Sequence, residues 1–251
     1  MFDLKFFYLQ HNRSSVFYYC ILQTISVACF RNKIASQLLT LQEGTYMAVK
    51  VLGISASPRA NSNTDLLLQK ALAGAECEGA SVKYIRLCDL NIAPCIECNS
   101  CFKTGECATK DDYQLLMEKM LDADRLIFAT PIFFMAVCSQ AKVLIDRCQC
   151  LWAHKHVLKK PLITAGRDRR AMVIAVGGSK SKKMFDCVRL TMTYYFDVLD
   201  MSYSANLFVN KMEEPGQIKN HPTALKEAFR LGAELITTPS PPEKPLDIEL
   251  T

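Results

Sequence analysis

From Met47 onward, two kinds of hydrophobic spacing alternate along the chain. Short apolar or alternating runs, bounded by small and polar residues, predict strands at 50–54, 82–87, 126–129, 172–176 and 205–209. Between them, apolar residues three and four apart predict helices at 63–78, 111–121, 139–152, 183–199 and 223–236. Each predicted strand is therefore followed by a predicted helix.

This alternation is typical of an α/β domain in which helices cover both faces of a parallel sheet. Five strands suit the smaller doubly wound arrangement, with strand order 2-1-3-4-5. In such sheets, ligands bind beyond the carboxyl ends of the strands, where the winding reverses. The loops that begin at Ser55, Thr130 and Gly177, after strands one, three and four, are therefore the candidate site.

The two ends of the chain differ from this pattern. Residues 1–46 are rich in aromatic side chains and show no lasting period, so we interpret them as an N-terminal extension. An upstream-start artefact or a poorly ordered segment is favoured; a membrane anchor at 16–30 and a docking element are the alternatives. The predicted domain covers 47–238, and the Pro-rich segment 239–251 is predicted to be a disordered tail.

Composition excludes several classes of protein. The 251 residues are 50% hydrophobic and 22% charged, which excludes disorder driven by charge and provides enough apolar side chains for a full core. The net charge of +5 is low for a dedicated nucleic-acid-binding protein. Twelve cysteines are more than a domain of this size needs for folding, so their positions decide their role.

The loop after strand one joins a strand to the N-terminus of a helix. Hydroxyls, an arginine and free backbone N–H groups at the positive end of a helix are suited to bind a phosphate monoester. Neither a Walker loop nor the dinucleotide glycine fingerprint is present. Helix capping alone is the structural alternative, but it needs only one such side chain. The predicted phosphate-binding residues are Ser55, Ser57, Arg59, Asn61, Ser62, Asn63 and Thr64.

Apolar side chains follow strand three, where a purely structural turn would be polar. A flat heteroaromatic ring could pack against this loop, although a core or subunit contact is an equal alternative. Together with a monophosphate loop at the neighbouring strand, the simplest single ligand is flavin mononucleotide (FMN). The predicted ring-binding residues are Pro131, Ile132, Phe133 and Phe134, with Gly177 and Gly178 from the loop after strand four.

Four cysteines fall within thirteen residues of the loop 88–110, after strand two. The spacing Cys95-x-x-Cys98-x-x-Cys101-x5-Cys107 suits a four-iron four-sulfur (4Fe-4S) cluster, with one thiolate for each iron. Zinc is the main alternative, although structural zinc more often uses two separated Cys-x-x-Cys pairs. Disulfides are disfavoured because bridges within this run would close very small loops.

Taken together, these motifs resemble the iron-sulfur flavoprotein group of the flavodoxin-like NADPH-dependent FMN reductase family. The resemblance covers about 49–236 and rests on 53–59 with 62–64, the four-cysteine run, 130–134 and 144–147. It implies a flavodoxin fold, FMN in the first loop and against 131–134, a cluster on the four cysteines, and a homodimer or homotetramer. Two departures stand out: Met135 where relatives often have glycine, and Ser179-Lys180-Ser181 after the glycine pair.

Weaker signals concern charge and the other cysteines. Between Lys155 and Lys183, nine basic residues face one acid, a run that could steer an acidic carrier or the phosphates of NADPH, although a solvated loop is favoured. Asp146 and Arg147 are interpreted as an ion pair on a helix surface or interface. A metal on His154 and His156 is disfavoured for want of a third ligand. We interpret the remaining cysteines of the domain, Cys77, Cys88, Cys138, Cys148, Cys150 and Cys187, as packing residues or incidental thiols.

The sequence therefore indicates a cytoplasmic FMN-dependent oxidoreductase. In the favoured hypothesis, a ferredoxin-like donor reduces the cluster, the cluster reduces FMN, and FMN reduces a small acceptor. In the first alternative, NAD(P)H reduces the flavin directly, as in FMN or quinone reductases, and the metal site is structural. In the second, the chain is a non-enzymatic zinc-stabilised binding module. No side-chain general acid or base is identifiable, and no nucleic-acid partner is expected.

Overall fold

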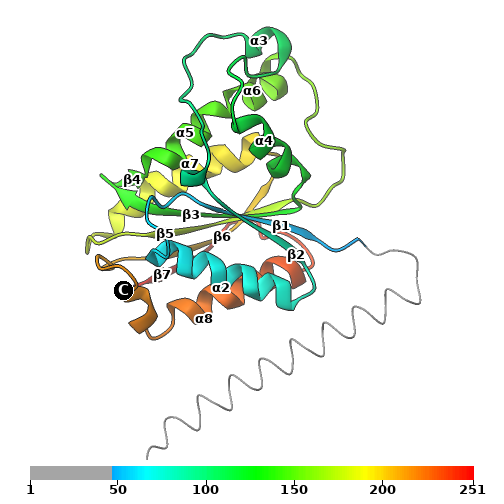
Figure 1. The fold of residues 1–251 in the computed structure, drawn as a ribbon. Coiled ribbons are helices and arrows are strands. Elements are labelled where there is room, and N and C mark those ends of the chain that lie inside the picture. The colour runs from blue at the N-terminus through cyan, green and yellow to red at the C-terminus, as the bar shows by residue number, and fades with distance from the viewer. Residues whose placement is uncertain (1–46) are drawn as a thin grey trace, which may run out of the picture. The chain divides into compact units, whose positions relative to one another are not determined.

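The computed structural model describes residues 47–251; the predicted N-terminal extension and the apolar segment 16–30 lie outside the described residues. The fold is a parallel sheet covered by helices on both faces (Figure 1). Its strands run in the order β2-β1-β3-β5-β6-β7. Their bounds are Ser81–Arg86, Lys50–Ser55, Arg125–Phe133, Arg170–Val176, Ser202–Val209 and Leu246–Leu250, and a short β4, Ala136–Val137, pairs antiparallel with the end of β3. The five predicted strands occupy the predicted order, so the flavodoxin-like fold is confirmed, although the sheet has seven strands rather than five.

Helices α2 (Asn63–Cys77) and α8 (Ala224–Thr237) lie on one face of the sheet, and α4 (Tyr113–Asp122), α5 (Ser139–Arg147) and α7 (Asp186–Val198) on the other (Figure 1). Successive strand residues point to opposite faces and separate two cores. Val51, Ile127 and Met172 belong to the core under α2 and α8, whereas their neighbours one residue later belong to the core under α4, α5 and α7. Both faces of the central strands are thus buried, which explains their continuous apolar sequences.

Short helical turns complete the fold. They are α3 (Cys101–Thr104), α6 (Gln149–Trp152), the 3-10 turns Leu87–Asp89, Lys182–Phe185 and Gln217–Asn220, and a π turn at Ala153–Val157. The single predicted helix 139–152 is therefore divided between α5 and α6 at Cys148. Apolar spacing alone could not locate this break, because both halves contribute buried residues to the same core. None of the helices in the described part of the chain is long and apolar enough to span a membrane.

The backbones of α2 and α8 approach each other closely at two glycines. A Cβ atom at Gly74 would lie 2.0 Å from the carbonyl oxygen of Phe229, and one at Gly232 would lie 1.9 Å from that of Ala71. Any side chain at these positions would push the helices apart. The two glycines therefore allow α2 and α8 to pack closely side by side on one face of the sheet (Figure 1).

The prediction of a disordered tail at 239–251 is wrong for its last part. Residues Leu246–Leu250 form β7, which adds to the sheet beside β6 in parallel. Its side chains are held on both sides: Asp247 accepts a hydrogen bond from Asn206 at 2.6 Å, and Arg189 on α7 pairs with Asp247 and Glu249. Without β7, the edge of β6 would leave backbone N–H and C=O groups unpaired.

Strand β3 continues beyond the predicted stop at Thr130-Pro131. The pairing of β1 with β3 ends at Ala129, whereas β5 stays paired as far as Pro131 opposite Val176. Proline has no N–H to donate, and strand positions without a partner on that side tolerate it. The extension reaches Phe133 and turns into β4, so the predicted ring-binding loop is the end of a strand rather than an irregular loop.

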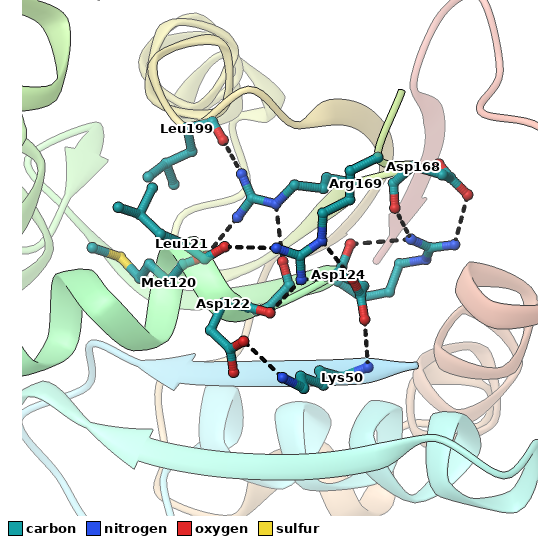
Figure 2. A network of polar contacts seen from close by, with 11 residues as sticks. Lys50, Met120, Leu121, Asp122, Asp124, Asp168, Arg169 and Leu199 are labelled. Carbon is teal, nitrogen blue, oxygen red and sulfur yellow. Dashed lines mark hydrogen bonds and ion pairs between the residues drawn. The ribbon is translucent and has the colours of Figure 1, made fainter. Parts of the chain in front are cut away.

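A network of arginines and aspartates lies at the opposite end of the strands from the predicted site (Figure 2). Arg169, which is 2% exposed, donates to the backbone carbonyls of Met120, Ala123 and Leu199. No carboxylate of the described residues forms an ion pair with it, and burial lowers its pKa to about 10. Beside it, the Asp168 carboxylate accepts from both Arg125 and Arg170. This network joins the first residues of β3 and β5 to the ends of neighbouring helices.

The network changes the interpretation of the basic run at 155–183. Arg167, Arg169 and Arg170 are consumed by contacts at the amino end of the sheet, with Arg167 bound to Asp124 at 2.7 Å. Two further members, Lys155 and Lys182, pair with carboxylates of α7, its C-terminus and β7. Most of the run is therefore structural, and it does not form one free basic surface for an acidic carrier.

Candidate functional site

The loop 56–62 enters α2 with its polar groups arranged as a helix cap. Ser62 is the N-cap residue: its Oγ accepts from the backbone N–H of Asp65 at 3.2 Å and lies 2.9 Å from Oγ1 of Thr64. Ser57 Oγ accepts from the N–H of Arg59 at 3.2 Å. The Arg59 side chain is exposed and forms no ion pair with the described residues. A helix N-terminus with hydroxyls and a free guanidinium is suited to bind an anion.

This loop forms one wall of a pocket of about 250 Å³ at the carboxyl edge of the sheet. The other walls come from the end of β3 and from the loops after β5 and β6. Ten of the predicted binding residues line it: Ser57, Arg59, Ser62, Asn63, Thr64, Pro131, Ile132, Phe133, Gly177 and Gly178. Loops that are distant in sequence thus meet here because the strands they follow are neighbours in the sheet.

Three predicted residues do not line the pocket. Ser55 is completely buried beneath the loop, where its hydroxyl donates to the carboxylate of Asp65. Asn61 is exposed and has a positive φ of 53°, so it serves the turn into the helix. Phe134 is fully exposed at the tip of the β3–β4 hairpin. The sequence predicts where the strand ends and the loop begins, but it does not show which side chains of the loop point into the pocket.

Asn63 lines the pocket, but its amide group already has two partners. Its Nδ2 donates to the carbonyl of Glu214 at 2.9 Å, and its Oδ1 accepts from the N–H of Ile218 at 3.1 Å. The side chain therefore ties the loop after β6 to the start of α2. The Asn63 side chain therefore has a structural role, and only its backbone is available to bind a ligand.

The loop after β6 contributes three pocket residues that sequence reasoning missed: Met212, Glu213 and Pro215. Its side chain closest to the glycine pair is that of Glu213, because a Cβ atom at Gly178 would lie 2.5 Å from Cγ of Glu213. These residues could have been predicted from the rule that ligands bind at the carboxyl ends of parallel strands, because β6 ends at the same edge of the sheet as β5. The glycine pair itself lines the pocket despite the polar residues that follow it, Ser179 onward.

The other departure, Met135, acts through the backbone. Phe134 and Met135 form the two-residue turn between β3 and β4, with Phe133 opposite Ala136. Both have positive φ, 49° and 62°, as type I′ turns require and as residues other than glycine rarely adopt. Met135 is 47% exposed and does not line the pocket. It therefore strains the turn rather than crowding the pocket.

A second pocket, of about 580 Å³, lies among α3, α5, α6 and α7 and shares no residue with the first. Cys95, Cys98, Cys101 and Cys107 all line it. All four are free thiols. No three Cys, His, Asp or Glu side chains among residues 47–251 are already grouped as in a metal site. The loop therefore brings its four thiols to one pocket without closing them around a single point.

The cysteine loop turns through three residues with positive φ: Glu97, Asn99 and Gly105. Gly105 also approaches an aromatic ring, because a Cβ atom there would lie 2.6 Å from Cδ2 of His154. Hydrogen bonds with Ser100 lower the pKa of Cys98, whereas burial raises that of Cys101. Repeated reversals of the backbone allow thiols three residues apart to face the same pocket.

Arg147 does not form the surface pair with Asp146 that the sequence suggested. Asp146 pairs with Lys142 one turn earlier, at 2.7 Å, on the exposed side of α5. Arg147 is 1% exposed and pairs with Asp111 at 2.6 Å. Burial alone would lower the pKa of Arg147, but the hydrogen bond and ion pair with Asp111 oppose this, and the pKa is raised.

The remaining cysteines of the domain divide by position. Cys77, Cys138, Cys148 and Cys150 are buried, as packing residues are, whereas Cys88 and Cys187 are exposed. Burial raises the pKa of Cys148 to about 12, which keeps this thiol protonated. Cys148 and Cys150 line the second pocket beside the four predicted ligands. Among the described residues, the one carboxylate within ion-pair distance of His154 or His156 is that of Asp197, 3.9 Å from Nε2 of His156.

Comparison with known proteins identifies the family. The model of the family described as NADPH-dependent FMN reductase matches residues 49–214. The chain belongs to this family. It is therefore an FMN-dependent oxidoreductase, and the resemblance inferred from its motifs is confirmed.

Curated relatives define its group more closely. One iron-sulfur flavoprotein of Methanocaldococcus jannaschii is 34% identical over 166 residues, which are 63% of this chain and 79% of that protein. Another from the same organism is 42% identical over 103 residues, 41% of this chain; the match spans about half (53%) of that relative's length. These relatives support the iron-sulfur flavoprotein group.

Solved structures support the fold. RosB with the bound intermediate 8-demethyl-8-formylriboflavin-5′-phosphate has a TM-score of 0.58 at 23% identity, over 74% of this chain and 77% of RosB. The NAD(P)H:quinone oxidoreductase of Methanothermobacter marburgensis has a TM-score of 0.55 at 16% identity, over 75% of this chain and 98% of that one. Both share the parallel α/β sheet described above.

Proposed function

We propose that this oxidoreductase is an iron-sulfur flavoprotein that passes electrons from a ferredoxin-like donor, through a 4Fe-4S cluster, to FMN and on to a small acceptor. The observation that carries the proposal is the presence of two separate pockets. One gathers ten of the predicted FMN-binding residues at the carboxyl edge of the sheet, and the other gathers the four predicted cluster thiols. The proposed location is the cytoplasm.

The first pocket fits FMN in the chemistry of its residues. The N–H groups at the start of α2, the hydroxyls of Ser57 and Thr64, and the guanidinium of Arg59 suit the phosphate. Ile132 and Phe133 offer apolar surface on the opposite wall, next to the bare backbone of the glycine pair. When bound, FMN supplies the hydride and single-electron chemistry; the residues bind it, orient it and exclude water around its ring.

The second pocket fits a 4Fe-4S cluster in its donor set. Cys95, Cys98, Cys101 and Cys107 are the residues that would hold it, and thiolates are the usual ligands of such clusters. Arg147 is among the residues around this pocket, and a buried positive charge beside it suits anionic sulfur. Four-thiolate zinc remains the alternative occupant, because the same donor set binds it.

Separate pockets also favour an oligomer. Since the two pockets have no residue in common within one chain, electron transfer between their occupants would be helped by a second subunit that brings its cluster beside the flavin. A homodimer or homotetramer is therefore part of the proposal. Exposed apolar side chains beside the cysteine pocket, Leu190 and Tyr194 on α7 and Trp152 on α6, are candidates for such a contact.

The family's description favours NAD(P)H as an alternative donor, with the metal site then structural. Most basic residues of the run 155–183 are bound to groups of the same domain, so this run no longer supports an acidic protein such as ferredoxin as the donor. A non-enzymatic binding module is disfavoured by membership of an enzyme family.

Anaerobic purification followed by an absorbance spectrum and metal analysis tests the proposal. A brown protein with a broad shoulder near the flavin bands, bleached by dithionite, is the expected result. A yellow protein with stoichiometric zinc and no iron contradicts the cluster, and a colourless protein that takes up no added FMN contradicts the flavin site. Rapid bleaching of the flavin by NADPH alone favours the direct reductase.

Two cysteine variants sharpen this test. Cys98→Ser removes an exposed thiol of the predicted cluster site, and Cys187→Ser removes an exposed thiol of α7 that lies outside both pockets. We expect iron to be lost from the first variant and retained in the second. Equal iron contents in both would contradict the assignment of the ligands.

A further inference from the structure

Arg147, the last residue of α5, is the largest of the fully buried side chains. Its Nη1 donates to the carbonyl of Ala93 at 2.8 Å and to Asp111 at 2.6 Å. Its Nη2 donates to the carbonyl of Thr109 at 3.0 Å and to the other oxygen of Asp111 at 3.2 Å. A buried guanidinium with four such bonds is held in one position.

The partners of Arg147 lie at the two ends of the cysteine loop. Ala93 stands two residues before the first cysteine, and Thr109 two residues after the fourth. Asp111 joins the same ends, because its carboxylate accepts from the backbone N–H of Ala93 and of Tyr113, each at 2.9 Å. One buried ion pair therefore fixes both ends of the loop to each other and to α5.

One N–H of Arg147 remains without a partner. Its Nε is buried and makes no hydrogen bond within the described residues, and the guanidinium packs over the Tyr113 ring at 4.7 Å. Arg147 and Cys107 both belong to the residues around the cysteine pocket, although the Arg147 side chain itself has no exposed surface. An unsatisfied buried donor is costly, so Arg147 is kept buried at this place by its other contacts and its charge rather than by satisfaction of every N–H.

We propose that Arg147 is the positioning residue of the cluster site, which holds both ends of the four-cysteine loop and keeps its buried positive charge beside the pocket that the four cysteines line. The inference rests on the proposed function. One-electron reduction adds one negative charge to the site, and the electron comes from the external donor. A fixed positive charge stabilises that reduced form more than the oxidised form, so Arg147 favours reduction.

The test compares three variants of the FMN-loaded protein, each reconstituted with iron and sulfide under anaerobic conditions. Arg147→Gln removes the charge and the fork, and Arg147→Lys keeps the charge but cannot make the forked contacts. Lys142→Gln is the matched control, because it removes one positive charge from the exposed side of the same helix. Iron content, FMN content and an anaerobic redox titration of the cluster are measured for each.

We expect Lys142→Gln to match the wild type. Arg147→Gln should hold less iron, and its remaining clusters should show a reduced-to-oxidised ratio about tenfold lower at a fixed potential, which is 59 mV for a one-electron couple. Arg147→Lys should hold an intermediate amount of iron, with a ratio about threefold lower. FMN content should stay unchanged in all three, because the other pocket shares no residue with this one.

The possible contrary results are distinct. If Arg147→Gln holds full iron and titrates like Lys142→Gln, the inference is wrong. If Arg147→Gln holds no iron, the titration of Arg147→Lys decides, and values equal to the wild type overturn the inference. Loss of FMN together with iron would assign Arg147 to folding of the whole domain and also overturn it. A wild-type protein that takes up no cluster contradicts the proposed function instead.

Discussion

The strained turn between β3 and β4 yields a prediction that depends on the fold alone. Met135 has a φ of 62° and Phe134 one of 49°. A residue with a side chain in the left-handed region costs about 1–2 kcal/mol, because its Cβ crowds the following carbonyl. Glycine escapes this cost but loses about 0.5–1 kcal/mol through its larger backbone entropy in the unfolded chain. Met135→Gly should therefore stabilise the protein by about 0.5–1 kcal/mol.

Met135→Ala is the matched control. It removes the same half-exposed side chain but keeps the Cβ atom, so it keeps the strain. We expect the glycine variant to unfold at a higher urea concentration than the alanine variant, and at a temperature about 2 °C higher for a domain of this size. Combining Phe134→Asn with Met135→Gly creates the Asn-Gly pair preferred in type I′ turns and should add to the gain.

The assay is urea and thermal unfolding of the FMN-loaded protein, followed by far-ultraviolet circular dichroism. A glycine variant that is no more stable than the alanine variant would refute the prediction, because the positive φ of Met135 would then carry no measurable strain.

Three further predictions concern the two pockets. Arg59→Ala should weaken FMN binding about tenfold in a fluorescence titration, because a charge-assisted hydrogen bond contributes about 1.5 kcal/mol, whereas the exposed Lys70→Ala should not. Gly105→Ala should lower iron content, since its Cβ would meet a neighbouring imidazole; Gly166→Ala, with a similar φ but nothing within 4 Å, should retain iron. Burial opposes ionisation of Asp111, but Arg147 holds its pKa below the ordinary value of 3.8. The ionised Asp111 carboxylate therefore contributes its full stabilisation above about pH 3.8, and this contribution is lost as the pH falls through its lower pKa in the folded protein. The urea midpoint of the wild type should fall over this pH range, and that of Asp111→Asn should fall less.

Local sequence patterns predicted the elements of the sheet because burial on both faces leaves continuous apolar strands. The same patterns failed for β7, whose residues Leu246–Leu250 alternate with charges after a Pro-rich segment. That strand forms only because β6 presents an unpaired edge and Arg189 on α7 binds its carboxylates. The sequence of 246–250 alone does not show this pairing, because the partner strand lies about 40 residues earlier in the chain.

The candidate pocket shows the same division. Loop residues such as Ser57 and Arg59 could be predicted, because a strand end followed by a helix start already defines their position. Their orientation could not: Ser55 and Phe134 belong to the same loops, yet one is buried below the pocket and the other points into solvent. The inward or outward direction depends on the sheet and on the hairpin.

By itself, the sequence determined the parallel α/β fold, the phosphate-type loop and the four-cysteine spacing, because each depends on residues close together in the chain. Only the tertiary structure decided what surrounds them. It separated the two pockets, turned the arginines of the basic run toward the amino end of the sheet, and buried Arg147 against Asp111, 36 residues earlier. Such contacts form because a buried charge needs a partner wherever the fold supplies one.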